Sequence, residues 1–317
     1  MPEFIDNYPP VDIIIPTMNC KVNLEKCLSS INKQDYRGKV LITIIDGGST
    51  DGTIELARYM GANVIVKVGM YGTGKNGARH FGETITSNPL IWNVDSDNII
   101  VETNVLSRLV NPFISDDTIN ISIPVTAIDD RASSFNNWIS ASEIEKVNKM
   151  IARGHKTQDG YVILQDMFYG LTNCTLIKRR IIETVEGYDS DIRTLSRIRT
   201  LELSKGVIDP TSHFYHNQVS SIINYFRKWS NRIHRFSKMN IKDLSNFFVD
   251  YPPKMEDDRE LKMNVVRTIF FDPLISLKFL FEKKQKYWIW GVIYSLVLVC
   301  YIALNFRIAF RVFRDFL

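Results

Sequence analysis

Residues 11–19 of the chain are VDIIIPTMN, a β-branched apolar run that stops at a proline and a polar turn. Such a run is typical of a strand that is buried on both faces of a sheet. Similar apolar runs follow at residues 40–45, 64–66 and 90–94. Between these runs, apolar residues at helical spacing predict a helix at residues 24–31, and a cap at Ser49 or Asp51 predicts a second helix that runs to Met60. A third helix is expected at residues 77–85. This alternation predicts an α/β fold with a mostly parallel sheet that helices cover on both faces.

The middle of the chain, residues 104–207, has a mixed pattern. It contains two runs that are typical of strands, at residues 118–125 and 171–177, and a helical pattern at residues 136–152. A further helix is expected from Lys178 onward. These patterns predict elements for this region but no topology.

The composition excludes several classes of protein. The 317 residues include 39 Lys plus Arg, 35 Asp plus Glu, 45% apolar residues, 16 glycines and 11 prolines. These values exclude collagen, disulfide-rich scaffolds and disordered low-complexity chains. The net charge of +4 is too small to indicate a protein that binds nucleic acid. The four cysteines form no C-x-x-C pair, so we expect neither a zinc site nor a disulfide framework.

The C-terminal part of the chain differs from the rest. Residues 222–240 contain five Lys or Arg and no acid, and a proline-marked polar linker follows at residues 250–253. Residues 287–306 are uncharged over about the 20 residues that a helix needs to cross a bilayer, with aromatic residues at one end. We therefore expect a transmembrane helix at residues 287–306. The alternative is a buried core helix.

A glycine-rich stretch at residues 72–77, GTGKNG, has the spacing of a dinucleotide-binding loop. That loop belongs at the first strand–helix turn of a sheet, however, and this stretch follows the third predicted strand. It also lacks the Ser or Thr of a Walker loop, because Asn76 occupies that position. What the stretch predicts is a cationic turn, rich in backbone amides and suited to a phosphate or a nucleotide.

Acidic residues follow the predicted strands. Asp95 and Asp97 come directly after the fourth strand, and two carboxylates at this spacing can share a divalent cation. The other polar residues that end or bracket a strand are Asp46, Asp51, Asp12 and Asn19. Because functional sites in such sheets lie at the carboxyl ends of the strands, we expect all these side chains to converge at one edge. The alternative for an Asp-x-Asp sequence is an ordinary solvated turn.

Four strings of the sequence, in this order and spacing, resemble the inverting glycosyltransferases of family 2. They are IIIPTMN at residues 13–19, IIDGGSTDGT at 44–53, GKNGARHFG at 74–82 and IWNVDSDN at 91–98. The resemblance is strong over residues 11–98 and continues weakly to about residue 235. It implies the GT-A fold, a nucleotide-sugar donor, a divalent metal cofactor (Mn or Mg), and attack by an acceptor hydroxyl with inversion at the anomeric carbon.

The resemblance also implies which residues form the donor site. The implied nucleotide-binding residues are Pro16, Thr17, Asn19, Asp46, Gly74, Lys75, Arg79 and Asp95. Among them Asp46 is expected to contact the base, and Asp95 to face the ribose or the donor sugar. Asp97 is expected to hold the metal, together with Asp95. Near the basic stretch, His213 and His216 resemble a family histidine that faces the diphosphate or the metal, and we single out His216.

The catalytic base is where the sequence departs from the family pattern. The family usually has a Glu-Asp pair shortly after a Gly-[Phe/Tyr]-Asp segment, and no such pair follows residues 187–189. Asp191 is the first candidate for the base and Asp166 the second, with Asp189 and Glu202 as rivals. The alternative is that the acids near residue 190 only cap a helix or a loop. The final candidates in the tail are the cations near Arg227, which suit the diphosphate, a lipid phosphate or a solvated face.

Together these observations predict a membrane-associated glycosyltransferase. Its expected parts are a GT-A domain at residues 1–220, a basic helix and linker at 221–260, and an amphipathic segment plus the membrane helix at 261–317. The expected partners are a nucleotide-sugar donor, a lipid-linked or glycan acceptor and membrane lipid, with no nucleic acid. We expect the protein at the cell membrane, with the catalytic domain on the cytoplasmic side.

Two alternatives to this function remain open. A nucleotidyltransferase shares the sheet and the metal site, but it would need a glycine-rich loop after the first strand, where residues 16–19 have none. A catalytically inactive, membrane-bound glycan-binding protein is favoured by the missing Glu-Asp pair.

Overall fold

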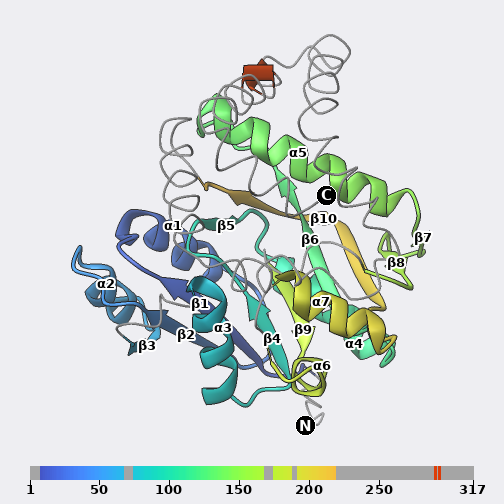
Figure 1. The fold of residues 1–317 in the computed structure, drawn as a ribbon, viewed down its shortest axis with the longest axis horizontal. Helices are drawn as coiled ribbons and strands as arrows, with labels where there is room; N and C mark the ends of the chain where they lie inside the picture. The colour runs from blue at the N-terminus through green and yellow to red at the C-terminus, as the bar shows by residue number, and fades with distance from the viewer. Residues whose placement is uncertain are drawn as a thin grey trace, which may run out of the picture. The chain divides into compact units, whose positions relative to one another are not determined.

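A computed structural model describes residues 8–67, 74–167, 174–187, 191–218, 289–290 and 292–293 of the chain (Figure 1). The chain divides into two compact units. The first unit comprises Met1–Ile128 and Ser142–Asn217, and the second comprises Asp129–Ala141 and Gln218–Leu317. The strands described below lie in the first unit, which therefore contains the sheet.

The elements of the described residues alternate as the sequence predicts at the start of the chain. The strands are β1 (Val11–Thr17), β2 (Val40–Asp46), β3 (Asn63–Val66), β4 (Leu90–Asn93), β5 (Asn98–Ile100), β6 (Ile121–Ala127), β7 (His155–Lys156), β8 (Val162–Leu164), β9 (Thr175–Lys178) and β10 (Gly206–His216). The helices are α1 (Lys21–Ile31), α2 (Thr53–Tyr59), α3 (Gly74–Ile85), α4 (Val105–Ser115), α5 (Ser134–Ile151), α6 (Arg179–Thr184) and α7 (Asp191–Thr200).

The strands form one mixed sheet with the order β3-β2-β1-β4-β9-β6-β10-β8-β7 (Figure 1). The first four strands are parallel, with β1 between β2 and β4 and with β3 beside β2. Strand β9 is antiparallel to both β4 and β6 and so joins this parallel half to the rest of the sheet. Strand β10 is parallel to β6 and antiparallel to β8 and to the short β5. The predicted α/β sheet is confirmed, and its antiparallel strands are an addition that the sequence did not reveal.

Side chains alternate between the two faces of the sheet along each strand, and apolar side chains on both faces pack against helices. On β1, Ile13 and Ile15 belong to one core cluster and Ile14 to the other. The first cluster includes residues of α1, α2 and α4, and the second includes residues of α3, α6, α7 and the C-terminal turns of α5. This two-sided burial explains why the first strands are continuous apolar runs.

Helix α3 lies unusually close to the sheet. A Cβ atom added to Gly82 would lie 2.6 Å from Cγ2 of Ile14 and 3.4 Å from Cγ1 of Ile45. Only a residue without a side chain allows this approach of the helix to β1 and β2. The close packing brings the first turns of α3 to the carboxyl ends of the strands.

One prediction about the strand ends is wrong. Asp12 lies near the start of β1, where its carboxylate binds Nη2 of Arg179 at 2.7 Å and accepts hydrogen bonds from the backbone and side chain of Asn88. Arg179 also donates to the backbone oxygens of Glu83 and Asn88. Asp12 therefore fastens α6 to the amino end of the parallel strands and does not belong to their carboxyl edge.

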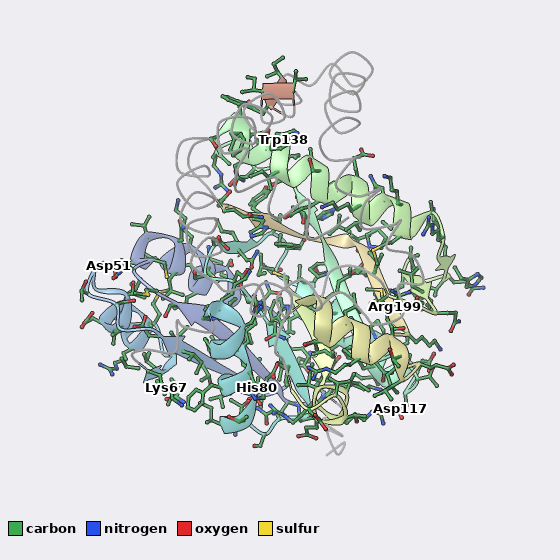
Figure 2. The ribbon with its side chains drawn as sticks, in the orientation of Figure 1. Asp51, Lys67, His80, Asp117, Trp138 and Arg199 are labelled. Atoms are coloured by element: carbon green, nitrogen blue, oxygen red, sulfur yellow. The ribbon has the colours of Figure 1, made fainter. Side chains whose placement is uncertain are left out.

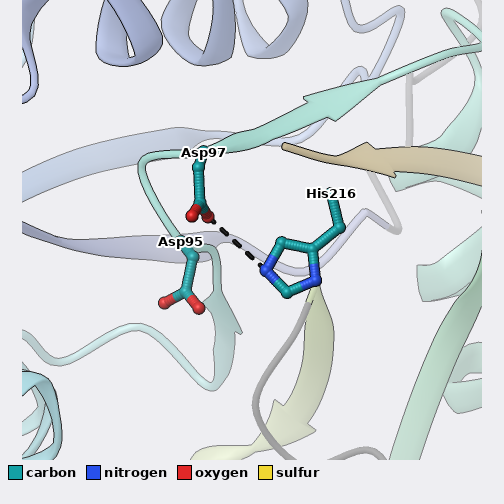
Figure 3. Close-up of side chains that lie close together, drawn as sticks. All are labelled: Asp95, Asp97 and His216. Atoms are coloured by element: carbon teal, nitrogen blue, oxygen red, sulfur yellow. Dashed lines mark ion pairs between the residues drawn. The ribbon is translucent and has the colours of Figure 1, made fainter. Parts of the chain in front are cut away.

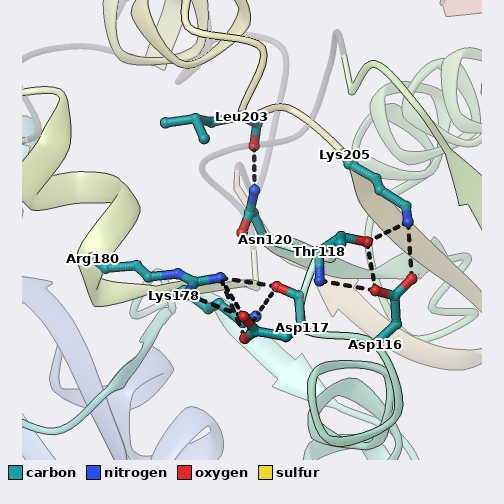
Figure 4. A network of polar contacts seen from close by, with 8 residues as sticks. All are labelled: Asp116, Asp117, Thr118, Asn120, Lys178, Arg180, Leu203 and Lys205. Atoms are coloured by element: carbon teal, nitrogen blue, oxygen red, sulfur yellow. Dashed lines mark hydrogen bonds and ion pairs between the residues drawn. The ribbon is translucent and has the colours of Figure 1, made fainter.

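A second polar network joins the segment after α4 to β9, α6 and the start of β10 (Figure 4). Lys178 and Arg180 both donate to the carboxylate of Asp117, and Lys205 donates to the carboxylate of Asp116 at 2.8 Å. Asn120 donates to the backbone oxygen of Leu203 at 2.9 Å. These contacts fix the entry into β6, which runs beside β10.

The second unit contains a small aromatic cluster. The ring of Phe135 lies 5.5 Å from that of Trp138 and 5.6 Å, edge to face, from that of Trp290. Trp290 also donates a hydrogen bond to Oγ of Ser134. No helix within the described residues combines the length and the apolar character that crossing a bilayer requires. The membrane helix predicted at residues 287–306 lies outside the described residues, apart from residues 289–290 and 292–293.

Candidate metal and nucleotide site

The turn that follows β2 is ordered around the carboxylate of Asp46, at the carboxyl ends of β1 and β2. Thr17 and Asp46 are opposite each other in the two strands, and Oγ1 of Thr17 donates to the Asp46 carboxylate at 2.7 Å. The backbone amides of Gly48 and Ser49 donate to the other carboxylate oxygen at 2.8 and 2.7 Å. Burial acts to raise the pKa of Asp46, but these hydrogen bonds and that of the Ser49 hydroxyl outweigh it and lower the pKa. Asp46 is therefore ionised, and its carboxylate stabilises the turn by accepting these hydrogen bonds.

The turn after β1 is tied to the same segment. Asn19 has a positive φ of 47°, its backbone amide donates to Oγ of Ser49, and its side-chain oxygen accepts from the backbone amide of Thr50. Pro16 and Thr17 are buried, whereas Asn19 is exposed. The structure thus brings these predicted residues together with Asp46, and their contact with a nucleotide stays a prediction.

Asp95 lies two residues beyond the end of β4, between two cations of α3. Nη2 of Arg79 binds one carboxylate oxygen of Asp95, and Nζ of Lys75 binds the other at 3.0 Å. The Arg79 side chain is 0% exposed and that of Lys75 is 50% exposed. Burial alone would raise the pKa of Asp95, but the charges of Arg79, Lys75 and His216 hold it well below its usual range. Residues 74–77 of the glycine-rich stretch, for which the sequence predicted a turn, belong to the first turn of α3, and one of the two cations of this helix is completely enclosed.

Asp97 and His216 meet because of the pairing between β5 and β10. His216 lies directly opposite Asn98 in this antiparallel pair, next to Asp97, and the backbone amide of Asn217 donates to the Asp97 backbone oxygen at 3.0 Å. Nε2 of His216 consequently lies 3.6 Å from Oδ1 of Asp97 (Figure 3). Of the two histidines considered in the sequence, His213 faces away from this point, since its Nδ1 binds Glu102 at 2.8 Å.

His216 has a second acidic neighbour that the sequence did not predict. Its Nδ1 lies 3.3 Å from both carboxylate oxygens of Glu143 on α5. Burial acts to lower the pKa of His216, but the Glu143 hydrogen bond and the charges of Asp97 and Asp95 outweigh it and raise the pKa. No local motif marks Glu143, because its partners come from strands that are remote in sequence.

The donor atoms at this edge suit a divalent cation. Asp95, Asp97 and His216 each offer one ligand atom, and these atoms all lie within 4.8 Å of one another. Carboxylate oxygens suit magnesium and manganese, and an imidazole nitrogen suits transition-metal ions. The three residues therefore fit the metal site that Asp95 and Asp97 were expected to form, with His216 as an additional ligand.

The two candidate bases lie in different surroundings. The Asp166 carboxylate forms a two-point ion pair with Arg199 of α7, labelled in Figure 2, and accepts a hydrogen bond from Oγ of Ser204. Asp191 is the first residue of α7, and its side chain lies outside the described part of the structure. Glu202 follows the end of α7 with a positive φ of 58°. Asp189 and Arg227 lie outside the described residues.

An α/β sheet with acids and a histidine at the carboxyl ends of its strands, beside two cations, is an arrangement that suits a metal ion and a phosphorylated ligand. Residues 12–185 match the family model described as Glycosyl transferase family 2. That match covers more than half of the chain, which therefore belongs to glycosyl transferase family 2. The resemblance stated from the sequence is confirmed.

Individual relatives match over shorter stretches. An N-acetylglucosaminyltransferase of Azorhizobium caulinodans is 36% identical over 108 residues, which are 32% of this chain and 27% of the relative. Glycosyltransferase AglE of Haloferax volcanii is 32% identical over 93 residues, which are 28% of this chain and 31% of the relative. The matched part thus spans less than a third of the length of these two relatives.

The fold is also similar to that of a solved transferase. The mannosyltransferase PcManGT of Pyrobaculum calidifontis, solved in complex with GDP-Man and Mn²⁺, has a TM-score of 0.50 and 19% identity to this chain. The alignment covers 69% of this chain and 60% of that one. At this identity the comparison concerns the fold alone, and it supports the predicted GT-A architecture.

Proposed function

We propose that the chain transfers a sugar from a nucleotide-sugar donor to an acceptor hydroxyl, with inversion at the anomeric carbon and with the help of a divalent metal. The observation that carries this proposal is the meeting of Asp95, Asp97 and His216 at the carboxyl edge of the sheet, next to the cations of α3. Family membership supports the reaction class. The imidazole in the ligand set favours Mn²⁺ over Mg²⁺.

The two cations of α3 have different roles in the proposed binding of the donor. Arg79 is fully enclosed and holds Asp95, so its role is to fix the carboxylate. Lys75 is half exposed at the start of the helix, where its ammonium group can reach a phosphate oxygen. We assign Lys75 to the donor diphosphate and the Asp46 turn to the nucleoside.

The transfer needs one proton acceptor. The acceptor oxygen bonds to the anomeric carbon while the bond from that carbon to the phosphate oxygen breaks, and the nucleoside diphosphate leaves with the electron pair. The hydroxyl proton moves to a carboxylate. Asp191 is our choice for this base over Asp166, because Arg199 and Ser204 already bind the Asp166 carboxylate. When bound, the metal supplies positive charge that stabilises the leaving diphosphate.

The acceptor and the membrane belong to the same proposal. The basic stretch at residues 222–240 and the apolar stretch at residues 287–306 suit an anionic bilayer surface and its hydrocarbon core. They support an acceptor that is lipid-linked or lies near the membrane, and a catalytic unit on the cytoplasmic side.

A donor screen tests the proposal. Thermal unfolding of the full chain is followed with Mn²⁺ and a panel of nucleotide sugars, since a bound ligand raises the melting temperature. The stabilising donor is then incubated with candidate acceptors and the released nucleotide is identified. Release of nucleoside diphosphate is expected, whereas release of sugar 1-phosphate would indicate a nucleotidyltransferase, and glycan binding without any release would indicate an inactive binding protein.

Matched variants assign the residues. Asp97→Asn is expected to abolish Mn²⁺-dependent stabilisation by the donor. Asp191→Asn is expected to lower turnover by about 10²-fold or more while donor binding stays unchanged, because a general base contributes at least that much. Asp166→Asn removes an equivalent charge and is expected to retain turnover. Full turnover in Asp191→Asn would remove this residue from the mechanism.

A further inference from the structure

The imidazole of His216 is clamped between two acidic groups that have different relations to the metal site. Its Nε2 faces Asp97 at 3.6 Å, and its Nδ1 faces Glu143 at 3.3 Å (Figure 3 shows the Asp97 side). The ring is only 6% exposed. Among the described residues, the group of converging ligand atoms includes Asp95, Asp97 and His216 but not Glu143. Glu143 therefore contacts the ring nitrogen of His216 that does not face Asp97.

The Glu143 carboxylate is itself held in place. Oγ1 of Thr126 donates to Oε2 of Glu143 at 3.2 Å. Thr126 belongs to β6 and lies opposite Phe214 of β10, two residues before His216 on the same strand. The Glu143 side chain is 14% exposed and that of His216 is 6% exposed, so little water competes for the imidazole N–H. Helix α5 and two neighbouring strands thus fix one geometry for the acid and the ring.

A histidine that binds a metal ion through Nε2 must carry its proton on Nδ1 and offer a lone pair on Nε2. An acceptor at Nδ1 selects that tautomer, orients the ring and makes Nε2 more electron-rich. Glu143 supplies such an acceptor on the side of the ring opposite to Asp97. Without it, the buried Nδ1–H would lose this acceptor, and the contact that selects the tautomer would be lost.

We infer that Glu143 is a positioning residue of the metal site, which fixes the tautomer and the direction of His216. This inference rests on the proposed metal-dependent function. It assigns to α5 a part in metal binding that neither the Asp-x-Asp sequence nor the family match specifies. Loss of such a partner typically weakens metal affinity about 10- to 100-fold.

The chain offers a closely matched control. Glu102 makes the same kind of contact with His213, three residues earlier on β10, where its carboxylate accepts from Nδ1 at 2.8 Å and from the backbone amide at 2.7 Å. That pair is not part of the ligand group at residues 95, 97 and 216. Changing Glu102 removes the same charge and a shorter, more exposed carboxylate–imidazole hydrogen bond at a pair outside the ligand group.

The experiment measures Mn²⁺ binding by the full chain, without donor or acceptor, from the electron paramagnetic resonance signal of free Mn²⁺ at one fixed pH. Glu143→Ala is expected to weaken binding about 10- to 100-fold. Glu143→Gln keeps an oxygen acceptor and is expected to recover most of that loss. Glu102→Ala and Glu102→Gln are expected to bind as the unchanged chain does.

A second measurement covers the case in which Glu143→Ala does not fold. Nitrogen-15 NMR of the imidazoles distinguishes the two neutral tautomers, and Glu143→Gln is expected to keep the His216 proton on Nδ1. A neutral His216 imidazole that carries its single proton on Nε2 in the unchanged chain would overturn the inference. So would Mn²⁺ affinity that is unaltered in Glu143→Ala, or that falls equally in Glu102→Ala.

These outcomes separate this inference from the proposed function. If the unchanged chain binds Mn²⁺ and Glu143→Ala binds it equally well, the positioning role is wrong and the glycosyltransferase proposal stands. If the unchanged chain binds no Mn²⁺ while Asp97→Asn is equally inert, the metal-dependent function is wrong and the role of Glu143 is wrong with it.

Discussion

Two cations share the Asp95 carboxylate, and the structure predicts opposite consequences for removing them. Arg79 is completely buried, and Lys75 is half exposed. The perturbation is a pair of equivalent substitutions, Arg79→Met and Lys75→Met, which remove the charge and keep an apolar side chain of similar length. Only the first substitution takes away the buried partner of a carboxylate that is 11% exposed.

The magnitudes follow from the degree of burial. Breaking a buried ion pair by removing one partner costs about 3–5 kcal/mol, because the remaining charge cannot be hydrated. A half-exposed pair contributes about 0–1 kcal/mol. We therefore expect Arg79→Met to lower the free energy of unfolding by about 3–5 kcal/mol and Lys75→Met by at most about 1 kcal/mol. At about 2–4 °C per kcal/mol, the melting temperature should fall by roughly 6–20 °C in the first variant and by a few degrees at most in the second.

The assay is thermal and urea unfolding of both variants, alone and combined with Asp95→Asn. In the Asp95→Asn background, Arg79→Met no longer takes the enclosed partner away from a charged carboxylate, and its cost should fall by about 0.5–3 kcal/mol, the range measured for residues in contact. Lys75→Met should weaken binding of a nucleoside diphosphate even though it hardly changes stability. The reasoning is refuted if the two methionine variants are equally stable, or if Asp95→Asn leaves the cost of Arg79→Met unchanged.

Two further predictions concern the stability of the sheet. The carboxylate of the buried Asp209 binds Arg108 at 2.6 Å. Burial acts to raise the pKa of Asp209, but the hydrogen bonds from Arg108, Ser212 and Thr211 outweigh this effect. They lower the pKa of Asp209 below the unfolded value of about 3.9. Asp209→Asn should therefore destabilise the chain at neutral pH, and the difference should shrink as the pH falls below about 4; an equal difference in urea unfolding at every pH would contradict this. Gly82→Ala should lower the urea midpoint by the equivalent of about 1–3 kcal/mol, since the new Cβ would lie 2.6 Å from Ile14, and a raised midpoint would contradict the close packing of α3.

The parallel half of the fold was predictable because its strands are long apolar runs. β1 and β2 have seven residues each, and the sequence located both, together with the helices that follow them. The short strands were not predictable in this way. β5 and β8 have three residues each, and this length is too short for an alternation to be recognised. Both strands form because they pair with β10, and a local sequence pattern carries no information about such a distant partner.

The same distinction holds for the site. Asp95 and Asp97 follow a predicted strand, so their place at its carboxyl end could be derived from the sequence. Asp12 was assigned to the carboxyl end of β1, but it lies near the amino end of this strand. Position in the sequence alone did not show that Arg179 binds it there. The sequence singled out His216 by its resemblance to the family, and the β5–β10 register places this residue beside Asp97.

The order in which the chain supplies these residues has a consequence for how the site forms. Asp95, Lys75 and Arg79 all come from the first hundred residues, and both cations bind Asp95 beside the parallel half of the sheet. His216 ends the last strand of the first unit, and it reaches Asp97 only when β10 pairs with β5. The cationic cluster around Asp95 therefore forms locally from α3 and the end of β4, whereas the candidate metal ligands come together only when β10 has joined the sheet. A substitution that loosens β10 should accordingly weaken metal binding before it disturbs the contacts of Asp95 with α3.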